Sequence, residues 1–135
     1  YWLVAVENDE VLGYEPDLLS NATTVSIDEA PSLVAKFGGV CYPAHIDREA
    51  NGIISVLGML PQSPQFSCVE FHSGEKIAEY EEKFGVKEHT KVVCSDAHYL
   101  ADIGEDKNFL LLEDEPYSSD FVRSELFKLL RGTGQ

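Results

Sequence analysis

A carboxylate and an imidazole follow closely on an apolar run of the sequence. Val92, Val93 and Cys94 form that run, and Asp96 and His98 come after it, two residues apart. Such a run is typical of a strand buried on both faces. If the backbone stays extended, side chains two residues apart project to the same side and can share a metal ion. The alternative is that Asp96 caps a turn and His98 is an ordinary loop histidine.

A second histidine follows another apolar run. Val40–Ala44 is predicted to be a short buried strand that leads directly into His45. Because the carboxyl ends of parallel strands meet at one edge of a sheet, His45 is expected near Asp96 and His98. Nitrogen and oxygen donors without cysteine suit Zn²⁺, Mn²⁺ or Fe better than a closed structural zinc does. An ion with an open position would activate a water for hydrolysis.

The other polar residues near these strand ends carry weaker signals. Arg48 could present its planar guanidinium to a phosphate, or it could simply pair with Asp47 or Glu49. Glu70 and His72 end the next predicted strand and project to one side. Glu70 could instead be the buried partner of a helix residue, and His72 could be merely solvated.

The predicted helices and strands alternate along the chain, and these elements must position the polar residues. This order predicts an α/β fold with a largely parallel sheet and right-handed crossovers. Ser26 and Glu29 have the spacing of a capping box. His89 falls between a helix and a strand, so it is expected on the surface at the opposite side of the sheet. The predicted hairpin strands are 2–6 and 11–14, the helices 26–37, 53–60, 75–84 and 118–130, and the strands 40–44, 67–71, 91–94 and 108–112.

The composition is that of one globular domain. The 135 residues are 44% hydrophobic and 25% charged. No apolar stretch reaches the length of a membrane span and no signal peptide is recognisable, which predicts a cytoplasmic protein without a membrane partner. The three cysteines are expected to be reduced core residues. The formal charge of −14 argues against an extended nucleic acid as a partner but leaves room for a small anionic substrate.

Two stretches resemble the third and fourth motifs of the PHP (polymerase and histidinol phosphatase) family. They are Pro43–Arg48 and Cys94–His98, and the resemblance covers most of the chain. It implies a distorted seven-stranded (β/α) barrel with divalent metal ions (Mn, Zn or Fe) at the strand ends, and hydrolysis of a small phosphate ester. His45, Asp96 and His98 would be the metal ligands, Asp96 and His98 the catalytic residues, and Arg48 the contact to the substrate phosphate.

The family's first motifs have no counterpart in this sequence. A His-x-His strand would precede Tyr1, and Tyr1–Leu19 contains no histidine. The 135 residues are therefore interpreted as a single C-terminal portion of a PHP domain, an incomplete barrel that begins with a hairpin. We expect it to lack part of the active site, to be inactive alone, and to shield its open sheet edge by self-association.

Two other function classes fit the same residues. One is a noncatalytic binding or regulatory domain whose histidines are structural. The other is an amidohydrolase-like barrel, which needs a modified lysine or its substitute at a strand end, whereas Lys91 stands at a strand start. Metal content separates the first of these from a metal-dependent enzyme.

Overall fold

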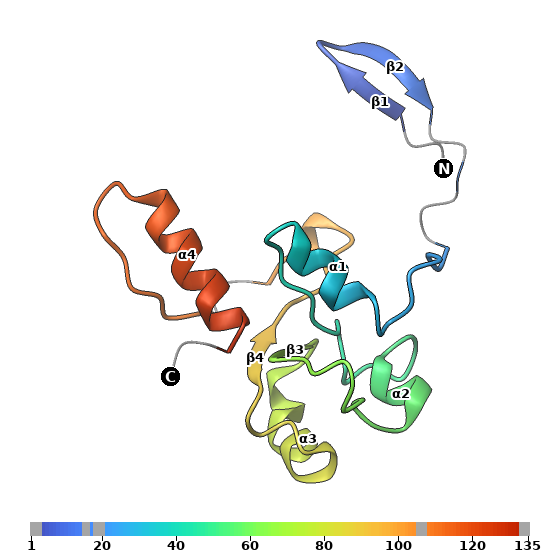
Figure 1. Cartoon of the computed structure of the whole chain (residues 1–135), viewed down its shortest axis with the longest axis vertical. Helices are drawn as coiled ribbons and strands as arrows, with labels where there is room; N and C mark the ends of the chain where they lie inside the picture. Colours follow the sequence, from blue (N-terminus) through green and yellow to red (C-terminus); the bar gives the residue numbers. More distant parts are fainter. Residues whose placement is uncertain (1–3, 15–16, 18–20, 105–107, 133–135) are drawn as a thin grey trace.

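The computed structural model describes residues 4–14, 17, 21–104 and 108–132. Within these residues the chain is a mixed α/β structure with two small sheets and no closed barrel (Figure 1). No helix in this part of the chain combines the length and the apolar character needed to cross a membrane. The elements are β1 (Val4–Glu7), β2 (Glu10–Tyr14), α1 (Ala30–Lys36), α2 (Ile53–Leu57), β3 (Cys68–Phe71), α3 (Ile77–Phe84), β4 (Thr90–Val93) and α4 (Ser119–Leu130), with 3₁₀ turns at Gly74–Lys76 and Leu100–Asp102.

The N-terminal hairpin is confirmed. β1 and β2 pair antiparallel, with Glu7 opposite Glu10 at the turn. Asn8 and Asp9 connect them with φ angles of 51° and 65°. Two consecutive positive φ angles are what a tight two-residue hairpin turn requires, and Asn and Asp tolerate them best after glycine. The hairpin stands apart from the rest of the molecule (Figure 1).

The capping box before α1 is also confirmed. The Ser26 N–H donates to Glu29 Oε2 over 3.1 Å, and the Glu29 N–H donates to Ser26 Oγ over 3.3 Å. These reciprocal bonds satisfy backbone donors that a helix start leaves open. α1 continues to Lys36, and Gly38, with a φ of 75°, ends it in the left-handed conformation.

The core forms around β3. This strand is buried along its whole length and pairs in parallel with β4. α3 covers it, and the Phe71 ring meets the Tyr80 ring edge to face at 5.6 Å between centroids. The apolar side chains of this helix that pack against the buried core are Ile77, Tyr80 and Phe84. The buried cluster consists of Ile46, Ile54, Val69, Phe71 and Val86.

The predicted strand Val40–Ala44 is wrong, although its end lies beside β3. Pro43 O accepts from the Glu70 N–H at 3.1 Å, and Glu70 O accepts from the Ile46 N–H at 2.9 Å. A regular parallel pair would use the N–H of residue 45, one position earlier. His45 is inserted with a φ of 44°, which interrupts the ladder as a bulge does. Since Pro43 has no N–H, the segment cannot extend the pairing there.

The predicted strand Asn108–Leu112 is also wrong. Phe109 and Leu111 are exposed by 75% and 86%. Asn108–Leu110 and residues of β4 together line a cavity of about 380 Å³. The segment therefore lies beside β4 without pairing with it. The largely parallel sheet predicted from the sequence is, in the described residues, one parallel pair.

The apolar run over residues 53–60 predicts a buried helix, but the helix that forms is shorter and less buried. α2 ends at Leu57, because Gly58 adopts a left-handed φ of 77°. Only Ile54 of this helix is buried, whereas Val56 and Leu57 are exposed. The interpretation as a buried helix is therefore wrong. For the last helix the prediction holds, since Ser118 Oγ accepts from the Phe121 N–H at its start.

All three cysteines are free, and Cys68 alone among them is fully buried. Burial raises the pKa of the Cys68 thiol to about 12, with the nearby Glu70 carboxylate adding to the shift. Burial, followed by Glu70, raises the pKa of Cys94 to about 11. Both thiols are therefore protonated and unreactive near neutral pH.

Cys68 is expected to resist alkylation in the folded chain. With a pKa near 12, its thiolate fraction at pH 8 is on the order of 10⁻⁴. Mass spectrometry after iodoacetamide treatment should show slow labelling of Cys68 in buffer and rapid labelling in concentrated urea. Equal rates in the two conditions would contradict its burial.

Candidate functional site

The site lies where the chain leaves β4. The Cys94 N–H still donates to Phe71 O at 3.0 Å, so the parallel ladder continues one residue beyond the strand. Asp96 then takes a left-handed φ of 52°. The expectation that an extended backbone would place Asp96 and His98 on one side is wrong, because the chain turns at Asp96. With Asp96 in this left-handed conformation, the two side chains nevertheless lie close together.

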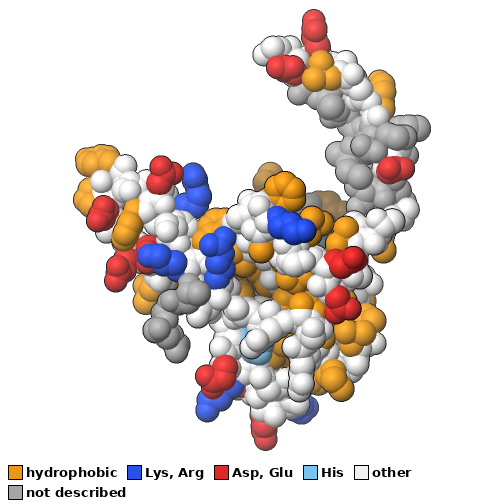
Figure 2. Space-filling view, viewed as in Figure 1, with side chains coloured by type: hydrophobic (Ala, Val, Ile, Leu, Met, Phe, Trp, Pro, Cys, Tyr) orange, Lys and Arg blue, Asp and Glu red, His pale blue; other side chains and the backbone are white. Residues whose placement is uncertain are grey.

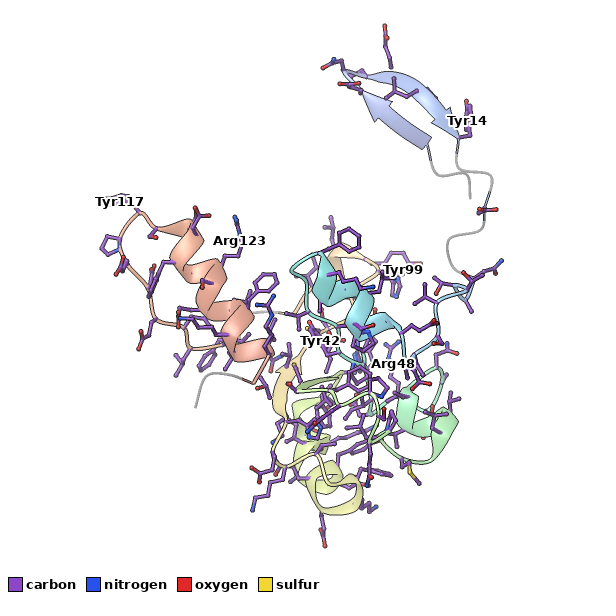
Figure 3. All side chains as sticks on the ribbon, viewed as in Figure 1. Tyr14, Tyr42, Arg48, Tyr99, Tyr117 and Arg123 are labelled. Carbon is purple, nitrogen blue, oxygen red and sulfur yellow. The ribbon has the colours of Figure 1, made fainter. Side chains whose placement is uncertain are left out.

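The structure brings the four sequence-predicted site residues together around the Asp96 carboxylate. His45 Nε2 lies 3.4 Å from Asp96 Oδ1, and His98 Nε2 lies 3.5 Å from the same oxygen. Arg48 Nη1 lies 2.7 Å from the other oxygen, Oδ2. Figure 3 shows Arg48 in the body of the molecule, below α1. Two imidazoles and a guanidinium therefore converge on one carboxylate.

This surrounding keeps Asp96 ionised. Partial removal from water raises its pKa, but the neighbouring His45, Arg48 and His98 lower it by more, so the pKa lies below its usual value. A carboxylate that stays charged can accept from cationic groups or ligate a metal ion. The two alternatives for Arg48, pairing with Asp47 or Glu49, are replaced by its ion pair with Asp96.

Glu70 of β3 contacts the site through His45. It is buried, and its Oε1 lies 2.8 Å from His45 Nδ1. The approach is not aligned as a hydrogen bond, so the buried Nδ1 atom has no hydrogen-bond partner. A carboxylate behind one imidazole nitrogen commonly leaves the other nitrogen facing a metal. The signal in the sequence was a single charge within an apolar strand, which must find a partner when it is buried.

The two remaining histidines differ in their distance from the site. The His72 ring lies edge to face with the His45 ring, with 6.3 Å between centroids. His89 precedes β4 and so lies at the opposite end of that strand from Asp96, as expected. It is half-buried rather than on the surface, and burial lowers its pKa.

Sequence reasoning missed Asp47 as a functional candidate. Its side chain is buried and accepts from the N–H groups of His72 and Ser73. Although a serine is a common helix cap, the Ser73 side chain makes no capping bond. An Asp two residues after a site histidine gave no local signal, because its partners lie far along the sequence.

The donor chemistry suits a divalent metal only in part. Among the described residues, no group of three His, Cys, Asp or Glu side chains is placed to hold one ion. Yet His45 Nε2, the shared Asp96 oxygen and His98 Nε2 belong to a set of nitrogen and oxygen donors that borderline ions accept. His98, with 75% of its side chain exposed, has room to change rotamer. His45, Asp96 and His98 thus fit as part of a ligand set.

The comparisons with known proteins assign no family to this geometry. The sequence matches no family model, and neither the curated proteins nor the solved structures contain a significant match. The residues that converge on Asp96 are therefore the structural basis for a function.

Proposed function

We propose that this chain is the C-terminal portion of a PHP-like metal-dependent phosphoesterase. His45, Asp96 and His98 would hold a divalent ion, and Arg48 would bind the phosphate of a small ester. The observation that carries the proposal is the approach of His45 Nε2 and His98 Nε2 to the same Asp96 oxygen, at 3.4 and 3.5 Å. These residues come from the two stretches that resemble the family's motifs.

A divalent ion bound here would supply a nucleophile at neutral pH and polarise the phosphate. Asp96 contributes a carboxylate that stays ionised among three cationic or polarisable neighbours. Glu70, behind His45 Nδ1, favours a ring orientation in which Nε2 faces Asp96. The protein's own part in the chemistry is thus to present oriented donors around one point.

Arg48 is suited to the substrate. Its side chain is 41% exposed and contacts Asp96 through Nη1. Because a guanidinium carries five N–H donors in a planar fork, pairing with one carboxylate oxygen leaves donors for phosphate oxygens. The Arg48–Asp96 pair holds this cation at the site before substrate arrives.

The uncovered apolar surface supports the interpretation as an incomplete barrel. The chain exposes 10770 Å², about one and a half times the roughly 7,000 Å² expected for a compact protein of 15.0 kDa. Large apolar side chains such as Phe37, Leu100 and Leu111 are more than four-fifths exposed. Figure 2 shows apolar side chains over the central body of the molecule. A preceding barrel half or a second copy of the chain would cover them.

A second candidate is a noncatalytic binding domain. The observation in its favour is the Arg48–Asp96 ion pair, which neutralises the Asp96 carboxylate without a metal. The amidohydrolase-like alternative has less support, because Lys91 Nζ is paired with Glu81 of α3.

Metal titration separates the two candidates. By calorimetry with Mn²⁺ or Zn²⁺, the chain should bind a divalent ion, and His45→Ala and His98→Ala should each weaken binding at least about tenfold. His89→Ala, which removes an imidazole at the opposite end of β4, is the matched control and should leave the affinity unchanged. The chain alone should hydrolyse p-nitrophenyl phosphate no faster than the His98→Ala variant does.

Two results would count against this proposal. If the chain binds neither ion, the noncatalytic domain becomes the better explanation. If the chain alone shows efficient metal-dependent phosphatase activity, the idea of an incomplete active site is wrong.

A further inference from the structure

Asp47 lies between the two residues that reach Asp96 from one turn, His45 and Arg48. The residue is 2% exposed, and its carboxylate accepts from backbone N–H groups after β3. We propose that Asp47 is a positioning residue, which ties this turn to the end of β3 and so holds His45 and Arg48 against Asp96. The proposal rests on the function proposed above, and it concerns a residue that touches neither metal nor substrate.

The carboxylate makes two charge-assisted bonds across a long sequence separation. The His72 N–H donates to Asp47 Oδ1 at 2.7 Å, and the Ser73 N–H donates to Oδ2 at 2.9 Å. Both acceptor oxygens are used, and both donors belong to the segment that follows β3. Because Gly74–Lys76 and α3 come next, Asp47 supplies from a distant loop the negative charge that a helix start favours.

The backbone on either side of Asp47 is tied to the same region. The Lys76 ammonium donates to Asp47 O at 2.9 Å, and the Ile46 N–H donates to Glu70 O at the same distance. Ile46 is completely buried in the core cluster. The turn is closed by the Arg48 N–H, which donates to His45 O at 3.0 Å. The turn from His45 to Arg48 is therefore attached to the end of β3.

His45 needs such support because its backbone is strained. Its φ of 44° lies in the left-handed region, which costs free energy for a residue with a Cβ. Such a conformation persists where surrounding contacts determine it. Without the Asp47 bonds, the turn can relax toward ordinary φ values. His45 and Arg48 would then leave Asp96 together.

The test uses Asp47→Asn in the full chain, with Glu49→Gln as the control. Asparagine keeps one acceptor oxygen but turns an NH₂ group toward the second backbone N–H. Glu49 is an exposed carboxylate directly after the turn, so its substitution removes the same charge without removing these bonds. Nuclear Overhauser contacts between the His45 and His72 rings report the geometry without any metal, and Mn²⁺ or Zn²⁺ titration reports its effect on binding.

We expect Asp47→Asn to lose the ring contacts and to bind metal at least about tenfold more weakly, while Glu49→Gln matches the unchanged chain in both. Far-ultraviolet circular dichroism should stay unchanged. Retention of both the ring contacts and the affinity in a folded Asp47→Asn would overturn the proposal. If that variant does not fold, Lys76→Met at an exposed position removes the bond from the Lys76 ammonium to Asp47 O. It should weaken metal binding roughly three- to tenfold. Unchanged metal binding would overturn the role of this bond.

Failure of the proposed function gives a different result. If the unchanged chain binds no metal, the metal site is wrong, but the ring contacts still decide whether Asp47 positions His45. Their loss in Asp47→Asn alone would support the positioning role without the metal, and their persistence would refute it.

Discussion

Replacement of Phe71 by alanine is expected to destabilise the chain by about 3–5 kcal/mol, the cost of removing a fully buried aromatic ring. Phe71 is completely buried at the end of β3, and its ring packs against Tyr80 of α3. Single domains are stable by only about 5–15 kcal/mol. This core has few buried apolar residues, so the substitution should remove most of its stability. The substitution would also disorder the end of β3. This end carries Glu70 and leads into the N–H groups that donate to Asp47.

Urea unfolding followed by circular dichroism measures this change. Phe37→Ala is the matched control, because it makes the same substitution at a side chain that is 86% exposed. The control should change the free energy of unfolding by no more than about 0.5 kcal/mol. Similar losses for the two variants would mean that the cluster around β3 is not the stabilising core.

The site residues could be predicted because local sequence marks them. Asp96 and His98 stand after an apolar run whose Val92 and Val93 form the second half of β4, and His45 stands beside β3. An apolar run ending in polar residues is a short-range signal, since burial dictates the run and the chain must leave the sheet where it stops. The same kind of local signal predicted the hairpin turn and the Ser26–Glu29 capping box.

The partners of the strands could not be predicted in the same way. Val40–Ala44 and Asn108–Leu112 have strand composition, but a strand also requires a neighbour in register. Pro43 and the inserted His45 limit the first to two bonds, and the second leaves a cavity beside β4. Strand composition is thus needed for a strand to form, but pairing with a neighbouring strand decides whether it does.

Contacts between residues far apart in the sequence were missed for a related reason. Asp47 bonds backbone groups 25 and 26 residues away, and Glu70 meets His45 across the same gap in sequence. No spacing rule connects residues so far apart. Even the approach of His98 to Asp96 came from a left-handed turn rather than from the alternation of a strand. The residue types pointed to the site, whereas its geometry depends on contacts that only the fold supplies.

Gly52→Ala is expected to disrupt the turn that carries His45 and Arg48, at a cost of about 1–3 kcal/mol in stability. Gly52 has an ordinary negative φ of −72°, so glycine is required there by space rather than by backbone conformation. A Cβ would lie 2.7 Å from Arg48 O and 3.0 Å from His45 O. Both obstacles are backbone atoms, which cannot rotate away, so the turn itself must shift.

Because that shift moves both residues that reach Asp96, the Gly52→Ala chain should also lose metal affinity, by about tenfold or more. Gly74→Ala is the control, since its Cβ would meet only Val93 Cγ2 at an ordinary 3.8 Å. Urea unfolding and metal titration of the two variants give the comparison. If Gly52→Ala kept both stability and affinity, the close approach of Gly52 to the 45–48 turn would not constrain the site, and the dependence of His45 and Arg48 on that turn would have to be abandoned.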